Sequence, residues 1–368
     1  MSDIRALHVM GTDLRMLGEI TNFKSLRIKR AFREVGDFQL VMNKRSKAAE
    51  LLQRDRLLFP VGEPEKCVII ESVQEAEGKD LLTLTGWQLK GIVKRRICLP
   101  PNDSSLEYRG FGYDRISGPA ETVLKHYLQN NITAPESTAR RIPEFFLEED
   151  QGRGMANVPW SARFEELEAI LKEICTYCDC GYDAVPDFAS GRCMLRFLPG
   201  RDRTVPGNRI VFSSQMGNVA DTTFTEDAKT YKNVAIVAGA GEDENRLVLI
   251  YAPTGETGMD RREMIVEAGS KDLTNGLDEE GPHKLANKPL KQTFKASILD
   301  TKSIRYGEDW DLGDLVTLVT GSRRIVARIT AVQETYEANK APKYEVTFGD
   351  PVDSIETVIK TRTQIVVR

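Results

Sequence analysis

Apolar and polar residues alternate in short segments over the N-terminal quarter of the chain. The alternation is clear at residues 25–30 and at residues 36–42. A period of two residues is typical of a strand with one buried face. Three further strands are predicted in the same region, at residues 56–60, 66–74 and 80–86. With a turn of helix at residues 47–53 and a closing helix at residues 88–96, the region predicts a small β-barrel or sandwich.

The composition changes after the first strand-rich region. Residues 99–104, LPPNDS, are rich in residues that break helices and strands, and they mark a domain boundary. Two segments downstream have the helical spacing of apolar residues, one opening at Gly118 and one near Phe164. Their apolar faces are Ala120, Val123, Leu124, Tyr127 and Leu128 in the first segment and Phe164, Leu167, Ile170, Leu171 and Ile174 in the second. With strands at residues 181–185 and 193–197, they predict a compact α+β domain.

Residues 231–251 predict a β-hairpin, and the rest of the chain is arranged around it. Two apolar runs, at residues 233–238 and 246–251, flank a turn rich in glycine and acidic residues. The turn contains Gly239 and Gly241, but a strand follows it and a third glycine is missing. A phosphate-binding loop needs that glycine and a helix, because the phosphate sits at the helix N-terminus. The pattern therefore argues against a nucleotide site.

A second strand-rich region includes the C-terminal part of the chain. Strands are predicted within residues 210–213, 306–319, 324–334 and 343–348. A tight turn at residues 311–314, DLGD, feeds the second of these strands. Residues 252–300 are polar with weak periodicity, and we interpret them as an insertion. The region predicts a second barrel.

The chain is therefore predicted to be a β-rich α+β protein with two small β-barrel domains and inserted α+β domains. The predicted domains are residues 1–98 for the first barrel, 99–207 for an α+β domain, 208–240 with 301–350 for the second barrel, 241–300 for an inserted domain and 351–368 for a C-terminal extension. A chain of 368 residues is too long for one compact core, which agrees with this division.

Charge is balanced along the chain. The 51 basic and 55 acidic residues are interspersed and give a formal net charge of -4, so no basic patch indicates a nucleic-acid partner. The apolar runs are too short to cross a bilayer, and the N-terminus MSDIRALHV lacks the apolar core of a secretory signal. Six scattered cysteines fit reduced thiols. We therefore expect a protein that is made and folded in a cytoplasm.

Three cysteines cluster at Cys175, Cys178 and Cys180. Together with Cys193, their thiolates are candidates for a zinc or iron–sulfur site. The spacing is not a common zinc pattern and no histidine lies nearby in sequence. The pattern favours the alternative, in which small buried side chains pack the end of a helix against a strand. We assign no metal site and no cofactor, and the sequence leaves both interpretations open.

Hydrolytic chemistry has little support in the sequence. Neither His8 nor His126 has a carboxylate or nucleophile companion close by, and His283 is the third histidine of the chain. Glu148, Glu149 and Asp150 offer carboxylates for a glycosidase, but a run of adjacent acids in a loop is usually a solvated face. We assign no catalytic residue.

The three tryptophans are Trp87, Trp160 and Trp310. Trp310 precedes the turn at residues 311–314. For this indole the sequence favours packing against the end of the barrel over an exposed platform that stacks on a sugar.

The strand motifs, taken in order, resemble one known family. They are GDFQLVMN at residues 36–43, LLTLTGWQLKGIVKRR at 81–96, NVAIVAGAGEDENRLVLIY at 233–251, DWDLGDLVTLV at 309–319 and YEVTFGD at 344–350. This series resembles the siphophage-type tail proteins of the baseplate hub superfamily, also called the tail-associated lysin N-terminal superfamily. The resemblance covers nearly the whole chain and depends on the order of the motifs.

The resemblance implies a fold and a function. It implies the phage tail hub fold, in which two tudor-like barrels per subunit let a homotrimer form a pseudo-sixfold ring. Such a ring joins a sixfold tail tube to a threefold tip, and DNA or the tape measure protein passes through it. The implied partners are copies of the chain itself, a distal tail or tail tube protein, a tip, spike or fibre protein and the tape measure protein. The implied location is the virion tail, with assembly in the host cytoplasm.

Two alternatives of different classes stay open. One is a tail-associated peptidoglycan hydrolase, although only residues 350–368 follow the hub-like region, where many relatives carry a lytic or fibre domain. The other is a module that binds wall carbohydrate, for which an aromatic content of 7% is low. The resemblance favours the non-enzymatic structural role.

Overall fold

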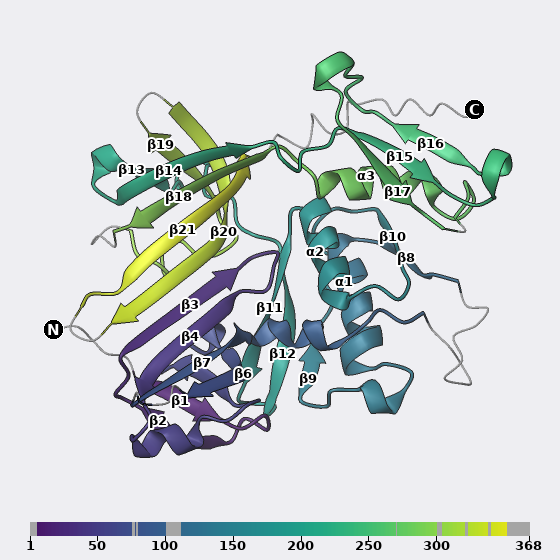
Figure 1. The fold of residues 1–368 in the computed structure, drawn as a ribbon. Coiled ribbons are helices and arrows are strands. Elements are labelled where there is room, and N and C mark those ends of the chain that lie inside the picture. Colours follow the sequence, from purple (N-terminus) through teal and green to yellow (C-terminus); the bar gives the residue numbers. More distant parts are fainter. Residues whose placement is uncertain are drawn as a thin grey trace.

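A long sheet forms the frame of the molecule in the computed structural model (Figure 1). The structure describes residues 6–75, 78, 80–100, 112–269, 271–299, 304–320, 323–337 and 340–351. Thirteen strands belong to the sheet, whose main path runs in the order β14-β18-β21-β20-β3-β4-β7-β6-β5-β1-β2. In the described part of the chain this path is open at both ends, at β14 and at β2.

The N-terminal half of the long sheet is formed by the predicted strands. Its members are β1 (Leu7–Met10), β2 (Met16–Ile20), β3 (Ser25–Ala31), β4 (Asp37–Asn43), β5 (Leu57–Pro60), β6 (Val68–Glu75) and β7 (Leu81–Gln88). All four residues of β5 are buried, because Leu58 faces one hydrophobic core while Leu57 and Phe59 face another. A strand covered on both faces is apolar throughout, which explains why β5 lacks the alternation of β3 and β4.

The C-terminal half of the long sheet has its own core. Its strands are β13 (Val211–Ser213), β14 (Val219–Asp227), β18 (Lys291–Ile298), β19 (Leu315–Thr320), β20 (Arg323–Glu337) and β21 (Lys343–Pro351). Trp310 is fully buried in this core and meets Phe212 edge-on at 5.4 Å between ring centroids. The packing role expected for Trp310 is confirmed.

One pair of strands joins the two halves. β20 pairs antiparallel with β3 from Ala331 opposite Ala31 to Glu337 opposite Ser25. Tyr336 of β20 lies in the core of the N-terminal half. The two halves therefore share a continuous backbone hydrogen-bond ladder at this seam (Figure 1).

The predicted α+β region packs against the N-terminal half. It contains β8 (Asp114–Gly118), α1 (Ala120–Leu128), β9 (Phe145–Leu147), β10 (Val158–Ala162), α2 (Leu167–Tyr177), β11 (Gly181–Asp187) and β12 (Arg192–Leu198). The buried face of α1 is the predicted one, and so is that of α2 except at one residue. Phe164 was expected on the face of α2, but it precedes the helix with a φ of 62° and is 48% exposed. This expectation was wrong because the helix begins only at Leu167.

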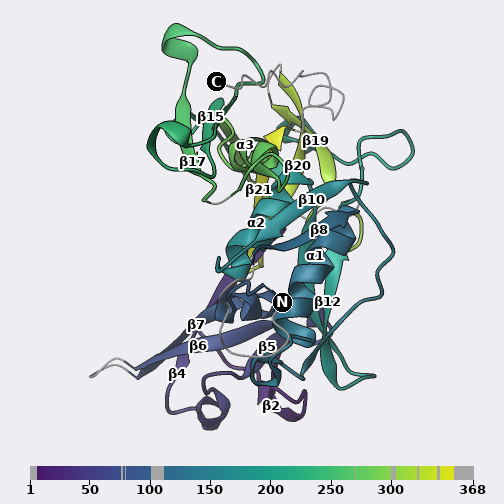
Figure 2. The ribbon, with the colours of Figure 1, turned by 90° about the vertical axis from the view of Figure 1, so that its right-hand side faces the viewer.

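A three-stranded sheet and a helix form a separate small unit. They are β15 (Val234–Ala238), β16 (Val248–Tyr251), β17 (Glu263–Glu267) and α3 (Leu277–Ala286). β15 and β16 form the predicted hairpin, and β17 runs parallel to β15 on its other side. Figures 1 and 2 show β17 and α3 next to α2 and β10.

Two strands lie in a different sheet from the one expected. β15 was grouped with the second barrel, but it pairs only with β16 and β17. β18 falls within the range interpreted as an insertion, but it pairs with β14 and β21 in the long sheet. The polar composition of residues 252–300 hid β18, because only half of its residues are buried. The domain limits themselves remain predictions.

Short helices complete the fold. The 3-10 helices are η1 (Lys47–Leu51), η2 (Pro64–Lys66), η3 (Leu89–Arg95), η5 (Thr138–Arg140), η6 (Ser214–Met216), η7 (Asp243–Asn245) and η8 (Gly258–Asp260), and η4 (Gln129–Thr133) is a π-helix. The helices predicted at residues 47–53 and 88–96 correspond to η1 and η3. Within the described ranges, no helix is both long and apolar enough to span a membrane.

Candidate functional site

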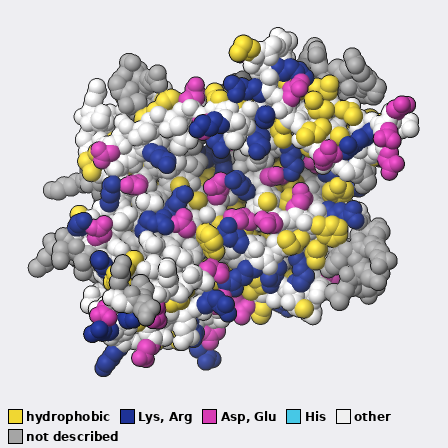
Figure 3. All heavy atoms as spheres, viewed as in Figure 1, with side chains coloured by type: hydrophobic (Ala, Val, Ile, Leu, Met, Phe, Trp, Pro, Cys, Tyr) yellow, Lys and Arg dark blue, Asp and Glu magenta, His cyan; other side chains and the backbone are white. Residues whose placement is uncertain are grey.

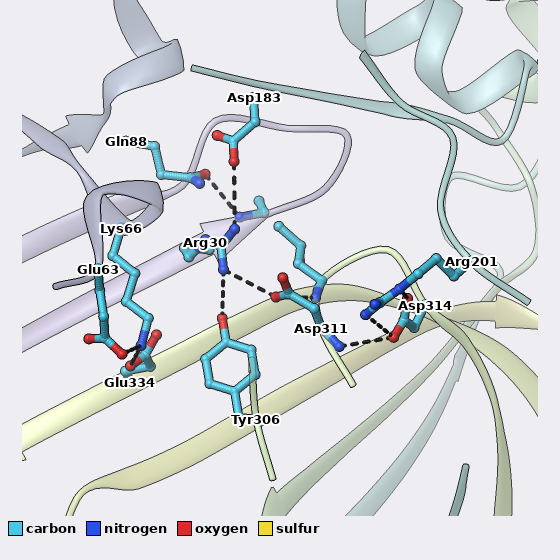
Figure 4. Close-up of polar contacts among 12 residues, drawn as sticks. Arg30, Glu63, Lys66, Gln88, Asp183, Arg201, Tyr306, Asp311, Asp314 and Glu334 are labelled. Carbon is cyan, nitrogen blue, oxygen red and sulfur yellow. Dashed lines mark hydrogen bonds and ion pairs between the residues drawn. The ribbon is translucent and has the colours of Figure 1, made fainter. Parts of the chain in front are cut away.

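A buried arginine lies where the two halves of the long sheet meet the α+β region (Figure 4). Arg30 is the penultimate residue of β3, and it is 3% exposed. Its Nη1 donates to the hydroxyl of Tyr306 at 2.9 Å and to Asp311 at 3.2 Å, and its Nη2 lies 3.5 Å from a carboxylate oxygen of Asp183 on β11. The guanidinium therefore connects three parts of the chain that are distant in sequence.

The partners of Arg30 determine its charge state. Burial works against the positive charge, but Tyr306, Asp311 and Asp183 outweigh this effect and raise the pKa of Arg30 above its ordinary value. Removing one partner of a buried ion pair leaves an uncompensated charge. We name the cluster of Arg30, Asp183, Tyr306 and Asp311 the polar junction.

A lysine and a glutamate form a second buried pair across the same seam. Lys66 of η2 donates to Glu334 of β20 at 2.6 Å and to Glu63 at 3.2 Å. The Glu334 side chain has no exposed surface, and it also accepts a hydrogen bond from the hydroxyl of Tyr336. Figure 4 shows this pair beside the polar junction. The N-terminal half is therefore fastened to β20 by a buried ion pair as well as by backbone hydrogen bonds.

The DLGD turn contributes a third ion pair. Asp314 is 1% exposed and accepts two hydrogen bonds from Arg201, at 2.7 Å from Nε and 2.8 Å from Nη2. It also accepts the backbone N–H of Asp311 at 3.0 Å, which closes the turn. The turn predicted at residues 311–314 therefore positions one carboxylate toward Arg30 and another toward Arg201 (Figure 4).

Lys90 is buried, and none of the described carboxylates lies in hydrogen-bonding contact with it. Its ammonium donates to the carbonyl oxygens of Ala31 at 2.6 Å, Phe32 at 3.1 Å and Tyr182 at 2.9 Å. Burial lowers the pKa of Lys90 to about 8. Lys90 therefore joins η3 to the end of β3 and to β11 by neutralising backbone dipoles rather than a charge.

The structure places three of the four candidate cysteines together. Cys175, Cys178 and Cys180 are buried at the end of α2, and the N–H of Cys180 donates to the carbonyl of Cys175 at 3.0 Å. Hydrogen bonds with Cys175 and Cys178, together with burial, raise the pKa of the Cys180 thiol. Cys193 lies on β12, where its electrostatic neighbour is Cys67. Among the described residues, no group of three or more His, Cys, Asp or Glu side chains is arranged to hold a metal ion.

Two histidines have carboxylate partners that the sequence did not reveal. His126 Nε2 lies 2.7 Å from Asp114 of β8, and His8 Nε2 lies 3.1 Å from Glu19, which β2 places opposite it. No companion was visible in the sequence because these carboxylates come close only when the elements pair. In the described part of the chain, no serine, threonine or cysteine side chain is hydrogen-bonded to either ring.

The acidic run at residues 148–150 contains two exposed acids and one that is ion-paired. Glu149 and Asp150 are exposed, as expected for a loop. Glu148 is ion-paired with Arg153 at 2.6 Å and with Lys125 at 3.3 Å. The same two cations bind Glu121; burial raises the pKa of Glu121, but hydrogen bonds from Arg153 and Lys125 outweigh this and hold it at about 2. The carboxylates of this cluster are neutralised by cations, which is typical of structural ion pairs.

The ends of the long sheet present open strand edges. Among the described strands β14 pairs only with β18, and six consecutive residues, 221–226, are exposed. β2 pairs only with β1, and its Met16 and Leu17 are 46% and 37% exposed. Unpaired N–H and C=O groups along such edges are sites where another chain can add. Basic and acidic side chains are interspersed over the face of the molecule in Figure 3, as the sequence predicts.

The long sheet, its seam and the flanking α+β region define a β-rich α+β fold that solved phage tail proteins share. A tail protein from Neisseria meningitidis MC58 superposes with a TM-score of 0.58 at 14% identity, covering 94% of this chain and 96% of that one. A 43 kDa tail protein of prophage MuSo2 from Shewanella oneidensis gives 0.54 at 10%, covering 93% and 98%. Prophage tail protein gp18 from Listeria monocytogenes EGD-e gives 0.51 at 12%, covering 97% and 98%.

The sequence itself assigns the family. Residues 6–350 match the model of the Siphovirus ReqiPepy6 Gp37-like protein family, and the chain belongs to that family. The resemblance to siphophage-type tail proteins is confirmed. No curated protein sequence matches the chain.

The sequence analysis missed the residues of the polar junction. The period of two residues puts Arg30 on the same face as the buried Leu26 and Ile28, so its phase was a signal of a buried charge that went unused. Lys90 did have a signal, because it is the only charge in the apolar run LKGIV at residues 89–93. A single charge inside an apolar run predicts a buried polar contact.

Proposed function

We propose that the protein is a non-enzymatic structural component of a phage tail, the baseplate hub. In this role three copies form a ring that joins the sixfold tail tube to the threefold tip. The observation that carries the proposal is the division of the long sheet into two halves, each with its own hydrophobic core, joined at one seam. Three chains with two such halves each supply six units around an axis.

Each half is proposed to be a barrel-like, tudor-like domain within the domain limits given above. The separate cores support this proposal, because strands must curl around a core in order to cover it from both sides. The α+β region and the small unit of β15–β17 and α3 are then insertions on the outside of the ring.

Ring closure is proposed to use the two open ends of the long sheet. The exposed residues of β14 are threonines and acids with one phenylalanine, Phe224, whereas β2 carries the exposed aliphatic residues Met16 and Leu17, so the two edges are unlike. Contacts between unlike surfaces are heterologous and form a ring when the rotation closes. The β2 edge of one copy therefore meets the β14 edge of the next.

The proposed partners follow from the position of a hub. They are a distal tail or tail tube protein on one side, a tip, spike or fibre protein on the other, and the tape measure protein and DNA in transit through the ring. An interspersed surface charge suits passage of DNA, because a basic wall retains phosphates by counterion release. The proposed location is the virion tail, after assembly in the host cytoplasm.

The proposal is tested by the mass in solution over a concentration series, measured by light scattering after size-exclusion chromatography. We expect a trimer near three times 41.3 kDa. The double variant Met16→Lys/Leu17→Lys is expected to shift the protein to monomer, because it adds charge to the β2 edge. Met259→Lys is the matched control, since Met259 is 98% exposed but lies outside both edges, and it should leave the trimer intact.

A strict monomer at every concentration, alone or with tail tube protein, contradicts the ring. The hydrolase alternative then requires release of peptidoglycan fragments that is lost in His126→Ala, because the His126–Asp114 pair is the nearest approach to a general base. The carbohydrate-binding alternative requires saturable binding to wall sugars.

A further inference from the structure

A polar pocket of about 370 Å³ lies over one face of the long sheet. The neighbouring strands β3, β20, β21 and β18 contribute to its lining (Figure 1). Lys172 and Thr176 of α2 line it as well, together with Asn287 and Pro289 from the segment that joins α3 to β18. The pocket therefore takes its lining from both halves of the long sheet, from the α+β region and from the end of the small unit.

The register of the four strands defines the floor of the pocket. Lys295 of β18 is opposite Thr347 of β21, which in turn is opposite Ala331 of β20, and Ala331 is opposite Ala31 of β3. Residues directly opposite each other on antiparallel strands point to the same face of the sheet. Three strand spacings measure about 14 Å. Lys295 therefore lies at one end of a row of small side chains of this width.

Cations dominate the charged lining of the pocket. The lining holds one carboxylate of the described chain, Glu34, against five cations, which are Lys29, Arg33, Lys172, Lys291 and Lys295. Arg33 is ion-paired with Asp179, and Lys172 lies 2.6 Å from Glu34. In the part of the chain that the structure describes, no carboxylate forms an ion pair with Lys29, Lys291 or Lys295. Three lysines of the pocket are thus left with uncompensated charge.

Glu34 is surrounded by several of these lysines. Burial raises the pKa of Glu34, but a hydrogen bond from Lys172 and the charges of Lys172, Lys29 and Lys291 outweigh this effect, so the pKa is lowered. One negative charge is therefore shared among three ammonium groups. It reduces the positive charge of the pocket but does not cancel it.

Other carboxylates nearby do not neutralise the pocket. An adjoining hollow of about 480 Å³ shares two of the lysines and adds Asp221 and Glu345. Glu345 lies 2.8 Å from Lys343, and Glu345 and Asp221 raise the pKa of that lysine. Asp227 of β14 is opposite Lys291, but its carboxylate accepts a backbone N–H at 2.8 Å. Even with these neighbours included, cations outnumber carboxylates around the pocket.

The remaining lining indicates which kind of anion fits. It consists of small or polar side chains, and the described lining contains no aromatic residue on which a base could stack. Four hydroxyls and one amide belong to it, from Thr176, Thr293, Thr330, Thr347 and Asn287. Lysine binds phosphate as a point charge, whereas a carboxylate is best bound by the fork of an arginine, and Arg33 is already paired with Asp179. The lining therefore favours phosphate groups and small hydroxylated groups.

The spacing of the unpaired lysines indicates the length of the ligand. Lys291 and Lys295 are four residues apart on β18, which corresponds to about 13 Å along the strand. Lys29 lies on β3, three strands away from β18. A single phosphate group cannot contact ammonium groups at these separations. The ligand must carry several phosphates along a chain.

We propose that this pocket binds a poly(polyol phosphate), a flexible chain of phosphate groups joined by small hydroxylated units. Lys29, Lys291 and Lys295 contact successive phosphates, and the threonine hydroxyls contact the polyol units. Every residue of the site comes from one copy of the chain. The site is therefore independent of ring formation by the proposed hub.

Binding of a labelled abasic hexamer of deoxyribose phosphate to the full-length protein tests the proposal. Fluorescence anisotropy should show saturable binding that weakens as salt is added, because counterions are released from the phosphates. The double variant Lys291→Gln/Lys295→Gln should bind at least about tenfold more weakly, and the slope of log K against log salt should fall by about 1.4, or 0.7 for each lost contact. Absence of saturable binding to the native protein overturns the proposal.

Two further variants separate the pocket from general charge effects. Lys24→Gln/Lys47→Gln makes the same change of charge at two exposed lysines outside the pocket, and it should bind the hexamer as the native protein does. Glu34→Gln removes the carboxylate from the lining, so it should bind about twofold more tightly or better. A misfolded variant would not gain affinity. Equal weakening in the two double variants overturns the proposal.

Two competitors identify the chemistry of the ligand. Hexathymidylate has the same phosphate chain with bases added, and it should compete about as well as the abasic hexamer, because the described lining has no stacking platform. Hexaglutamate carries a similar charge on carboxylates and should compete at least about tenfold less well. Much tighter binding of hexathymidylate would make the site one for nucleic acid, and equal binding of hexaglutamate would make it one for an acidic peptide. Either result overturns the proposal.

Discussion

Two polar clusters join parts of this molecule, and they differ in the charge of the side chain at the centre of each. At the polar junction the buried guanidinium of Arg30 contacts a phenol and two carboxylates, of which Asp183 is buried and Asp311 is 34% exposed. At the slot of about 270 Å³ between β17 and β10, the described part of the chain leaves the ring of a neutral His283 and the outer edge of β17 without hydrogen-bond partners. A cluster whose charges are paired holds its neighbours in one arrangement, whereas one with free donors and acceptors can take in another chain. The polar junction therefore fixes the fold, whereas the slot has groups available to bind a further polar group.

The largest expected effect comes from breaking the polar junction. Arg30→Met leaves Asp183 and Asp311 without their shared cation, so the free energy of unfolding should fall by about 3–5 kcal/mol. This change in the free energy of unfolding is measured by denaturant unfolding, monitored by circular dichroism. Arg27→Met is the matched control on the same strand, because the Arg27–Asp37 pair at 2.5 Å is about one-third exposed. It should cost about 1 kcal/mol or less.

If Arg30→Met lowers the free energy of unfolding no more than Arg27→Met does, the polar junction does not stabilise the seam between β3 and β20. The contrast between the two clusters is then wrong.

A smaller effect is expected at the slot when the pH falls. The folded state binds a proton at His283 only near pH 3, whereas the unfolded chain binds one near pH 6.5. The unfolded state therefore holds more protons between these values, and stability is lost as the pH falls through this window. The loss attributable to His283 at pH 4 is about 3 kcal/mol.

The measurement is the free energy of unfolding of the native protein and of His283→Phe at pH 7 and pH 4. The variant should lose less stability on acidification, because phenylalanine keeps the stacking on Trp160 but has no group to protonate. An identical loss in both proteins would mean that His283 accepts its proton without cost, and the slot would then be open to water.

The smallest effect concerns Lys90 at basic pH. Burial lowers its pKa to about 8, so between pH 8 and pH 10 the unfolded chain retains a proton that the folded chain has lost. Stability attributable to Lys90 therefore rises over this range, by about 2 kcal/mol. Buried thiols such as Cys98 act in the opposite direction, because their raised pKa favours the folded state at lower pH. The free energy of unfolding is measured against pH for the native protein and for Lys90→Met, and the difference between the two slopes gives the contribution of Lys90. Equal slopes would contradict a lowered pKa at Lys90.

Much of the fold was predictable because period and burial agree. The strands at residues 25–30 and 36–42 and the helices at α1 and α2 have one buried face each, which sequence periodicity detects. β18 was missed because its exposed residues made a polar segment. The grouping of β15 was missed because periodicity carries no information about which strand pairs with which.

The partners of Arg30 were not predictable from local sequence, although its phase with Leu26 and Ile28 indicated a buried side chain. Arg30 and Asp311 are separated by 281 residues, and no pattern in either neighbourhood indicates the other. The His126–Asp114 pair was missed for a related reason, since its atoms meet only when β8 lies beside α1. Trp310 was predicted correctly because a large aromatic residue before a tight turn has one common role, which is packing.

The seam between β3 and β20 can form only late in synthesis, after both strands have left the ribosome. Ala31 pairs with Ala331, so β3 emerges from the ribosome long before its partner exists. At about 5–20 residues per second, this delay is on the order of 15–60 seconds. During that time β3 has an unpaired edge and the core of the N-terminal half still lacks Tyr336, and such edges promote aggregation. The nascent chain is therefore a natural substrate for chaperones until β20 arrives.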